Sequence, residues 1–133
     1  MEINRITPDE HIFSQRLVHI ANPPKSLCYM GKLPETNAPV VSIVGSRKPS
    51  AYGKEVTERL ATDLAKAGCV IVSGLALGVD CIAQKAAIEA GGTVVAVVPN
   101  ELPDISPRTN YQLAMSIIKR GGAVVSEWMK GDN

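Results

Sequence analysis

The fold of this chain is decided by the stretch Val40-Val41-Ser42-Ile43-Val44-Gly45-Ser46-Arg47-Lys48-Pro49-Ser50. A β-branched apolar run ends there in a glycine turn, and Ser50 is a suitable N-cap for the segment that follows. That segment predicts an amphipathic helix, because apolar side chains recur along one face and Gly68 supplies a stop. The recurring positions are Tyr52, Val56, Leu60 and Leu64.

The same rhythm continues toward the C-terminus. Apolar runs follow at 70–72, 93–98 and 123–125, and helical patterns lie between them at 79–90 and 113–118. Such runs are typical of strands covered on both faces, and their alternation with helices predicts βαβ units with right-handed crossovers. We therefore predict an α/β fold: a three-layer, Rossmann-like parallel sheet of about four strands.

The N-terminal part of the chain has a different pattern. Prolines at 8, 23, 24 and 34 interrupt any long element. We expect residues 1–38 to form an N-terminal arm packed on the sheet, and residues 39–133 to form the Rossmann-like domain.

Composition narrows the functional classes. The 133 residues are 45% apolar and 20% charged, as in an ordinary globular protein. A membrane span and a secretory signal are not predicted, so we expect a cytoplasmic protein whose three cysteines are reduced thiols. The net charge of +1 disfavours a protein that coats nucleic acid by charge alone, so any nucleic acid must occupy a localised pocket.

Two turns carry the chemistry that an anionic ligand needs. In open α/β sheets, ligands bind beyond the carboxyl ends of the strands, where helix N-termini converge. The first turn offers Gly45 and Ser46 beside two cations, of which Arg47 suits bidentate phosphate binding and Lys48 acts as a point charge. We expect this turn to bind an anion together with the next one along the sheet.

The second turn is Ser73-Gly74-Leu75-Ala76-Leu77-Gly78. Its glycines permit unusual backbone conformations and close approach of a ligand. Asp80 follows the turn and either caps the next helix or contacts the ligand. The predicted phosphate- or DNA-binding residues are Gly45, Ser46, Arg47, Lys48, Ser73, Gly74, Leu75, Gly78 and Asp80.

Catalytic, metal and cofactor motifs are not apparent. The chain lacks a GxGxxG after its first strand run, a P-loop and a GxSxG elbow. Both histidines lie in the N-terminal arm, and Glu127 is more simply a solvated carboxylate than a catalytic base. We therefore predict no enzyme activity, no metal and no cofactor.

Several short motifs follow one another in a characteristic order: Val44-Gly45-Ser46-Arg47, Tyr52-Gly53, Ser73-Gly74-Leu75-Ala76, Gly78-Val79-Asp80, Gly91-Gly92-Thr93 and Gly122 through Ser126-Glu127. In this order they resemble the DprA/Smf family of DNA-processing proteins, from about Phe13 to Glu127. The resemblance implies a protein that binds single-stranded DNA, passes it to a RecA-type recombinase in natural transformation, and works as a dimer. It also implies that Ser46, Arg47, Ser73 and Gly74 contact the DNA.

The chain departs from the family pattern at three places. Ala83-Gln84 stands where the family usually has an Ala-His pair. The segment 100–107 lacks the family's tyrosine and adds Glu101 and Asp104, which would repel phosphates if they faced the site. The family's Arg-Asn-Arg segment and later strands are missing, which would leave an open sheet edge. Either the chain is a fragment of a longer protein, or a short homologue covers that edge by self-association, and on this ground we expect a homo-oligomer.

Two alternatives to DNA binding remain open. One is a nucleotide-binding protein or nucleotide hydrolase of the related phosphoribohydrolase-like superfamily, although the Pro-Gly-Gly-x-Gly-Thr-x-x-Glu motif of those enzymes is absent. The other is an inactive scaffold that keeps the fold without the binding activity.

Overall fold

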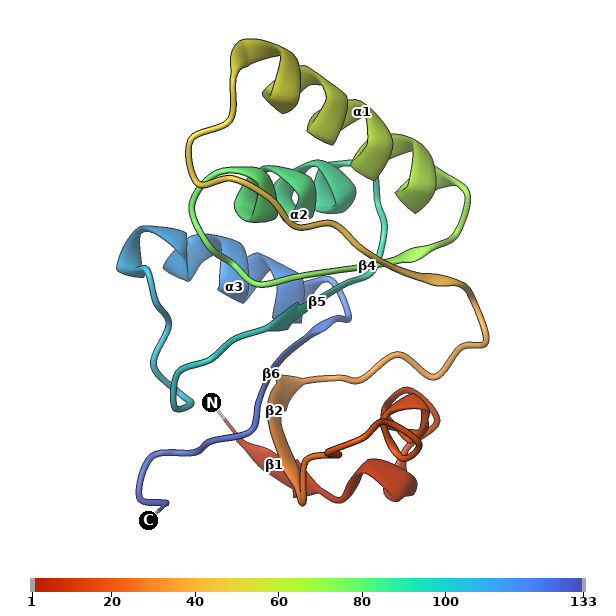
Figure 1. The fold of residues 1–133 in the computed structure, drawn as a ribbon, viewed down its shortest axis with the longest axis vertical. Helices are drawn as coiled ribbons and strands as arrows, with labels where there is room; N and C mark the ends of the chain where they lie inside the picture. The colour runs from red at the N-terminus through yellow and green to blue at the C-terminus, as the bar shows by residue number, and fades with distance from the viewer. Residues whose placement is uncertain (1, 133) are drawn as a thin grey trace.

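The computed structural model, which describes residues 2–132, contains the predicted strand–helix units in the predicted order (Figure 1). Ser50 is the N-cap of the first helix as predicted, because its Oγ accepts the Gly53 N–H at 3.0 Å. The units are β3 (Val40–Ser42), α1 (Ala51–Lys66), β4 (Val70–Ser73), α2 (Val79–Glu89), β5 (Val94–Val97), α3 (Tyr111–Lys119) and β6 (Ala123–Ser126).

Within residues 2–132, the sheet has six strands in the order β1-β2-β6-β5-β4-β3. The four predicted strands, β3 to β6, are parallel neighbours, which confirms the Rossmann-like class. The N-terminal segment adds β1 (Asn4–Ile6) and β2 (Leu27–Gly31), both antiparallel to their neighbours. Their contribution was missed because strands this short carry no clear alternation, and the boundary at residue 38 stays a prediction.

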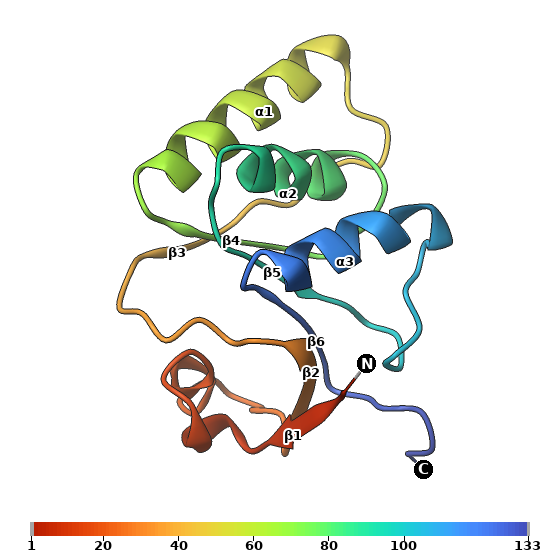
Figure 2. The ribbon, with the colours of Figure 1, turned by 180° about the vertical axis from the view of Figure 1, so that it is seen from behind.

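The added strands change the edges of the sheet. β2 pairs with β6, placing Cys28 opposite Ser126 and Gly31 opposite Ala123, so β6 is an internal strand. The outer strands are β1 and β3, each three residues long, and Figure 2 shows β3 at the far side of the sheet from β1. Short edge strands are one way in which proteins avoid edge-to-edge pairing. The last predicted strand, β6, is therefore paired on both sides, and the edges of the sheet are the short strands β1 and β3.

The two faces of the sheet are covered by different material. Alternate strand residues such as Val94 and Ala96 belong to the main core, on the side where all three helices lie (Figure 1). Val95 belongs to a second core, against which Phe13 and Leu17 of the N-terminal segment pack. This segment supplies the third layer through two short 3₁₀ turns, Pro8–Glu10 and Ser14–Leu17.

Candidate functional site

The carboxyl ends of the parallel strands meet at one edge of the molecule, the left edge in Figure 1. The turn 45–50 after β3, the turn 74–78 after β4 and the segment 98–107 after β5 lie along this edge. The sequence predicted the first two as neighbours. The sheet order places them side by side because β3 and β4 are adjacent parallel strands.

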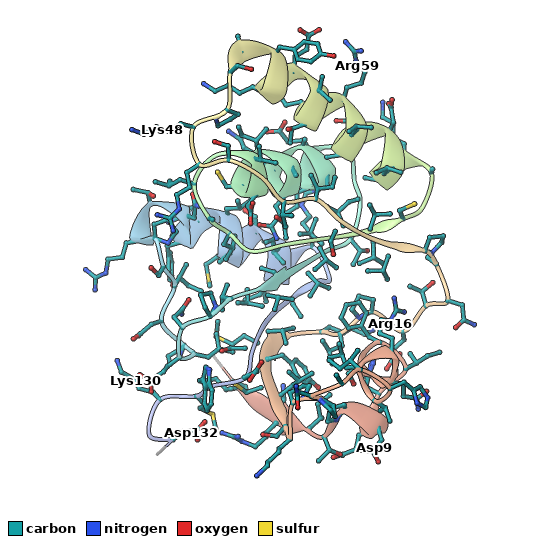
Figure 3. The ribbon with its side chains drawn as sticks, in the orientation of Figure 1. Asp9, Arg16, Lys48, Arg59, Lys130 and Asp132 are labelled. Carbon is teal, nitrogen blue, oxygen red and sulfur yellow. The ribbon has the colours of Figure 1, made fainter. Side chains whose placement is uncertain are left out.

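The turn 45–50 presents its cations to solvent. Arg47 and Lys48 are both exposed, and neither takes part in an ion pair among residues 2–132. Lys48 projects away from the body of the protein (Figure 3). Ser46 shapes the turn, since its Oγ accepts the Lys48 N–H at 3.0 Å. The turn therefore offers two free positive charges immediately before the N-terminus of α1.

The turn 74–78 presents backbone rather than side chains. Ser73 is 3% exposed, and its hydroxyl donates to the carbonyl oxygen of Ile43. The Leu75 side chain is fully buried in the main core. Both residues were predicted to bind phosphate or DNA, and their side chains are buried against the protein and not turned toward the surface. Gly74, in contrast, lines a surface cavity with its backbone.

The glycines bring the two turns into direct contact. The Val79 N–H donates to the Ser46 carbonyl at 3.0 Å. Gly78 has a φ of +87°, and a Cβ on it would overlap the Ser46 carbonyl oxygen and approach the Arg47 backbone to 2.6 Å. A Cβ on Gly45 would lie 3.0 Å from the Val79 side chain. Gly78 has the unusual conformation predicted for this turn, and what approaches its backbone is the neighbouring turn.

The Asp80 carboxylate links the same two turns by hydrogen bonds. Its Oδ1 accepts the Gly45 N–H at 3.3 Å and its Oδ2 accepts the Gly74 N–H at 3.1 Å. Asp80 is 8% exposed. Of the two roles left open for it, capping of the helix is not found, because the N-cap of α2 is Gly78 and no side chain caps that end. Asp80 instead fixes the distance between the turns with two charge-assisted hydrogen bonds.

A cavity of about 260 Å³ opens between the turns and the segment after β5. It lies below the range of about 300–1,000 Å³ typical of drug-sized ligands, so it suits a fragment such as one sugar, base or phosphate group. Glu101 and Asp104 are not among its lining residues, and Asp104 pairs with Lys130 at 3.3 Å. The cavity is lined by Arg47, Gly74, Ala76, Leu77, Pro99, Asn100, Ser106 and Pro107.

Sequence reasoning missed the residues that support the turn 74–78. Gln84, seen in the sequence only as a departure from a family pattern, hydrogen-bonds this turn from within the core. Asn110 reaches it from the start of α3, donating to the Leu75 carbonyl at 2.6 Å. The lining residues Pro99 and Ser106 also went unnoticed. Nothing in the local sequence marks these positions, because tertiary packing alone brings them to the site.

Within residues 2–132, no group of three or more His, Cys, Asp or Glu side chains is placed to hold a metal ion. None of the helices in that range combines the length and the hydrophobicity that crossing a bilayer requires. Glu127 and Trp128 lie at the end of β6, both exposed, and line a separate polar hollow with Arg5 and Lys25.

Comparison with known proteins gives consistent matches. Residues 4–133 match the family model for DNA recombination-mediator protein A. Protein Smf from Escherichia coli is 37% identical over 123 residues, which are 92% of this chain and 33% of that protein. The chain spans about a third of the length of this protein and of two other curated Smf proteins that it matches.

Two solved structures are similar over 99% of this chain. DNA processing protein A from Helicobacter pylori, whose single-stranded DNA binding mode has been described, is 35% identical with a TM-score of 0.81, and 58% of it is covered. The Streptococcus pneumoniae protein DprA is 31% identical with a TM-score of 0.83, and 46% of it is covered. Both matches include the N-terminal segment as well as the predicted parallel strands.

Proposed function

The chain belongs to the DNA recombination-mediator protein A family, and from this membership we propose that it binds single-stranded DNA at the carboxyl edge of its parallel sheet. One observation carries the proposal. Arg47 is exposed, takes part in no ion pair within residues 2–132, and lines the cavity between two turns that are locked together. A guanidinium so placed is suited to grip a phosphodiester with two hydrogen bonds.

The electrostatics favour an anion at this place. Lys48 adds a second free charge, and the first amides of α1 add the positive end of a helix dipole. The net charge of +1 means that attraction over the whole surface is weak, so binding depends on this local group. The extended backbone of single-stranded DNA can follow such an edge with one unit seated in the cavity.

The predicted residues divide into two roles in this proposal. Ser46, Arg47, Lys48 and the Gly74 backbone contact the DNA. Gly45, Ser73, Leu75, Gly78 and Asp80 hold the two turns at the correct spacing without direct contact. For Ser73, Leu75 and Asp80 the division follows from burial, because these residues are almost completely covered by protein. For Gly45 and Gly78 it follows from their close packing on the neighbouring turn.

The test compares two arginine variants that remove the same charge. Arg47→Ala removes a charge-assisted contact of about 1.5–3 kcal/mol, so we expect a loss of roughly tenfold to hundredfold in affinity for a fluorescent oligothymidine. The slope of log affinity against log salt should fall by about 1. Arg120→Ala, at the C-terminal end of α3 on the opposite edge, should bind like the unaltered chain. Equal affinities of the two variants would contradict the proposal.

A free mononucleotide is the second candidate ligand, because the cavity beside Arg47 is closer in size to one nucleotide fragment than to a chain. Thermal unfolding separates the two, since a ligand of the folded state raises the melting temperature. A shift with mononucleotides and none with the oligonucleotide would favour this candidate. We propose no catalytic role for any residue of the site.

The wider properties implied by the family also remain proposals for this chain. They are delivery of single-stranded DNA to a RecA-type recombinase, a role in natural transformation, self-association into a dimer, and a cytoplasmic location. The expectation of self-association rested on an open sheet edge, and this argument is weaker at β6 because β2 pairs with that strand.

A further inference from the structure

The turn after β4 contains a backbone conformation that a leucine rarely adopts. Leu75 has a φ of +60°, in the left-handed region that favours glycine. Such a conformation persists only when the surrounding structure holds it in place. Burial of the Leu75 side chain in the main core supplies part of this support.

Two amide side chains bind the backbone N–H and carbonyl oxygen of Leu75. The Oε1 of Gln84 accepts the Leu75 N–H at 2.9 Å. The Nδ2 of Asn110 donates to the Leu75 carbonyl oxygen at 2.6 Å. The N–H and the carbonyl oxygen of one strained residue are therefore each bound by a side chain, one from the middle of α2 and one from the N-cap of α3.

Gln84 is the deeper of the two amides and makes further contacts. Its Nε2 donates to the Ser73 carbonyl at 3.0 Å and lies 3.4 Å from the Val95 carbonyl. The residue is 0% exposed, so water cannot replace these partners. A buried amide with satisfied donors and acceptor fixes its neighbours firmly, because every alternative geometry leaves polar atoms unpaired. Gln84 thus ties the end of β4, the turn and β5 together.

We propose that Gln84 is the positioning residue that sets the turn 74–78 in its DNA-binding conformation. This inference rests on the proposed function. Gln84 holds Leu75 by a hydrogen bond, and Leu75 belongs to the same turn as Gly78. The Gly78 backbone in turn packs directly on Ser46 and Arg47. A shift of the turn moves the wall of the cavity and the backbone that carries the Arg47 guanidinium.

The first experiment replaces Gln84 by Met, which has similar size and no amide. If Gln84 only fills space, the variant keeps its affinity for oligothymidine, since swaps of similar volume are well tolerated in cores. We expect instead a loss of roughly tenfold or more, because the Leu75 N–H and the Ser73 carbonyl lose their partner. Ile88→Val, which trims the core on the same helix away from the turn, should lower stability and keep the affinity.

A second variant and a second readout separate local from global effects. Asn110→Ala removes the other support of Leu75 from a half-buried position and should weaken binding in the same direction. Amide hydrogen exchange should show that Leu75 loses protection in Gln84→Met while Val95 in β5 stays protected. Unaltered affinity in folded Gln84→Met, or unaltered exchange at Leu75, would overturn the inference. If the unaltered chain fails to bind the oligonucleotide, the proposed function is wrong, and the exchange result still decides whether Gln84 holds the turn.

Discussion

Replacing Gly78 by Ala tests the contact between the two turns most directly. The new methyl group would meet the Ser46 carbonyl oxygen and the Arg47 backbone, and neither is the end of a flexible side chain. The φ of +87° at Gly78 also disfavours any residue with a Cβ. The variant therefore combines a conformational penalty with a steric one.

The magnitude of each part is obtained by comparison with Gly68→Ala. Gly68 ends α1 with a φ of +92°, and nothing lies within 4 Å of a Cβ placed there. Gly68→Ala should therefore lose only the left-handed penalty of about 1–2 kcal/mol in the free energy of unfolding. Gly78→Ala adds overpacking of about 1–3 kcal/mol, and the φ of +87° and ψ of −134° at Gly78 lie in a region that is essentially restricted to glycine. Its total loss should therefore be at least about 2–5 kcal/mol.

Urea denaturation of both variants measures these losses from the shift in midpoint at constant slope. Binding to oligothymidine then shows whether the turns have separated. Gly78→Ala should be the less stable of the two and should bind weakly even where it is fully folded, while Gly68→Ala should bind normally. If the two variants were equally stable and bound DNA equally well, the tight contact between the turns would be refuted.

Two further predictions concern groups outside the site. The pKa of Asp132 lies below its ordinary value, because its carboxylate accepts the Met129 N–H and pairs with Arg5. The ionised carboxylate therefore stabilises the folded chain fully at pH values above the ordinary pKa. This stabilisation is lost as the pH falls through the lowered pKa of the folded state. An NMR titration of Arg5→Ala should show the pKa of Asp132 raised part of the way back, and no change would contradict the ion pair. Burial raises the pKa of the Cys28 thiol, and its Sγ lies 3.0 Å from the Trp128 carbonyl oxygen. Because the thiolate is the form that reacts, Cys28 should be alkylated more slowly at pH 8 than the half-buried Cys69 and Cys81. Equal rates for the three thiols, followed by mass spectrometry of peptides, would contradict that placement.

The parallel part of the fold was predictable because its signals are local. The apolar runs, the N-cap at Ser50 and the helix-ending glycine at 68 each act over a few residues of neighbouring chain. The two outer strands from the N-terminal segment were not predictable in this way. β1 and β2 are strands only because β6 offers β2 a partner, far away in sequence.

The candidate site divides in the same manner. Arg47 and Lys48 were identified from the sequence, since their charge and their place after an apolar run are local properties, and the exposure expected of them is present. The burial of the Ser73 and Leu75 side chains was not predictable in this way, because it depends on which distant residues pack against the turn.

The sequence by itself determined the alternation of strands and helices and the edge at which the turns lie, since both follow from periodicity and from the right hand of βαβ crossovers. Only the tertiary structure decided that Asp80 links the turns, that Gln84 and Asn110 hold Leu75, and that Gly78 packs on the neighbouring turn. The physical reason is the distance along the chain over which each signal acts. Periodicity records whether a residue is buried, whereas a hydrogen bond between side chain and distant backbone exists only once packing has set its distance and direction.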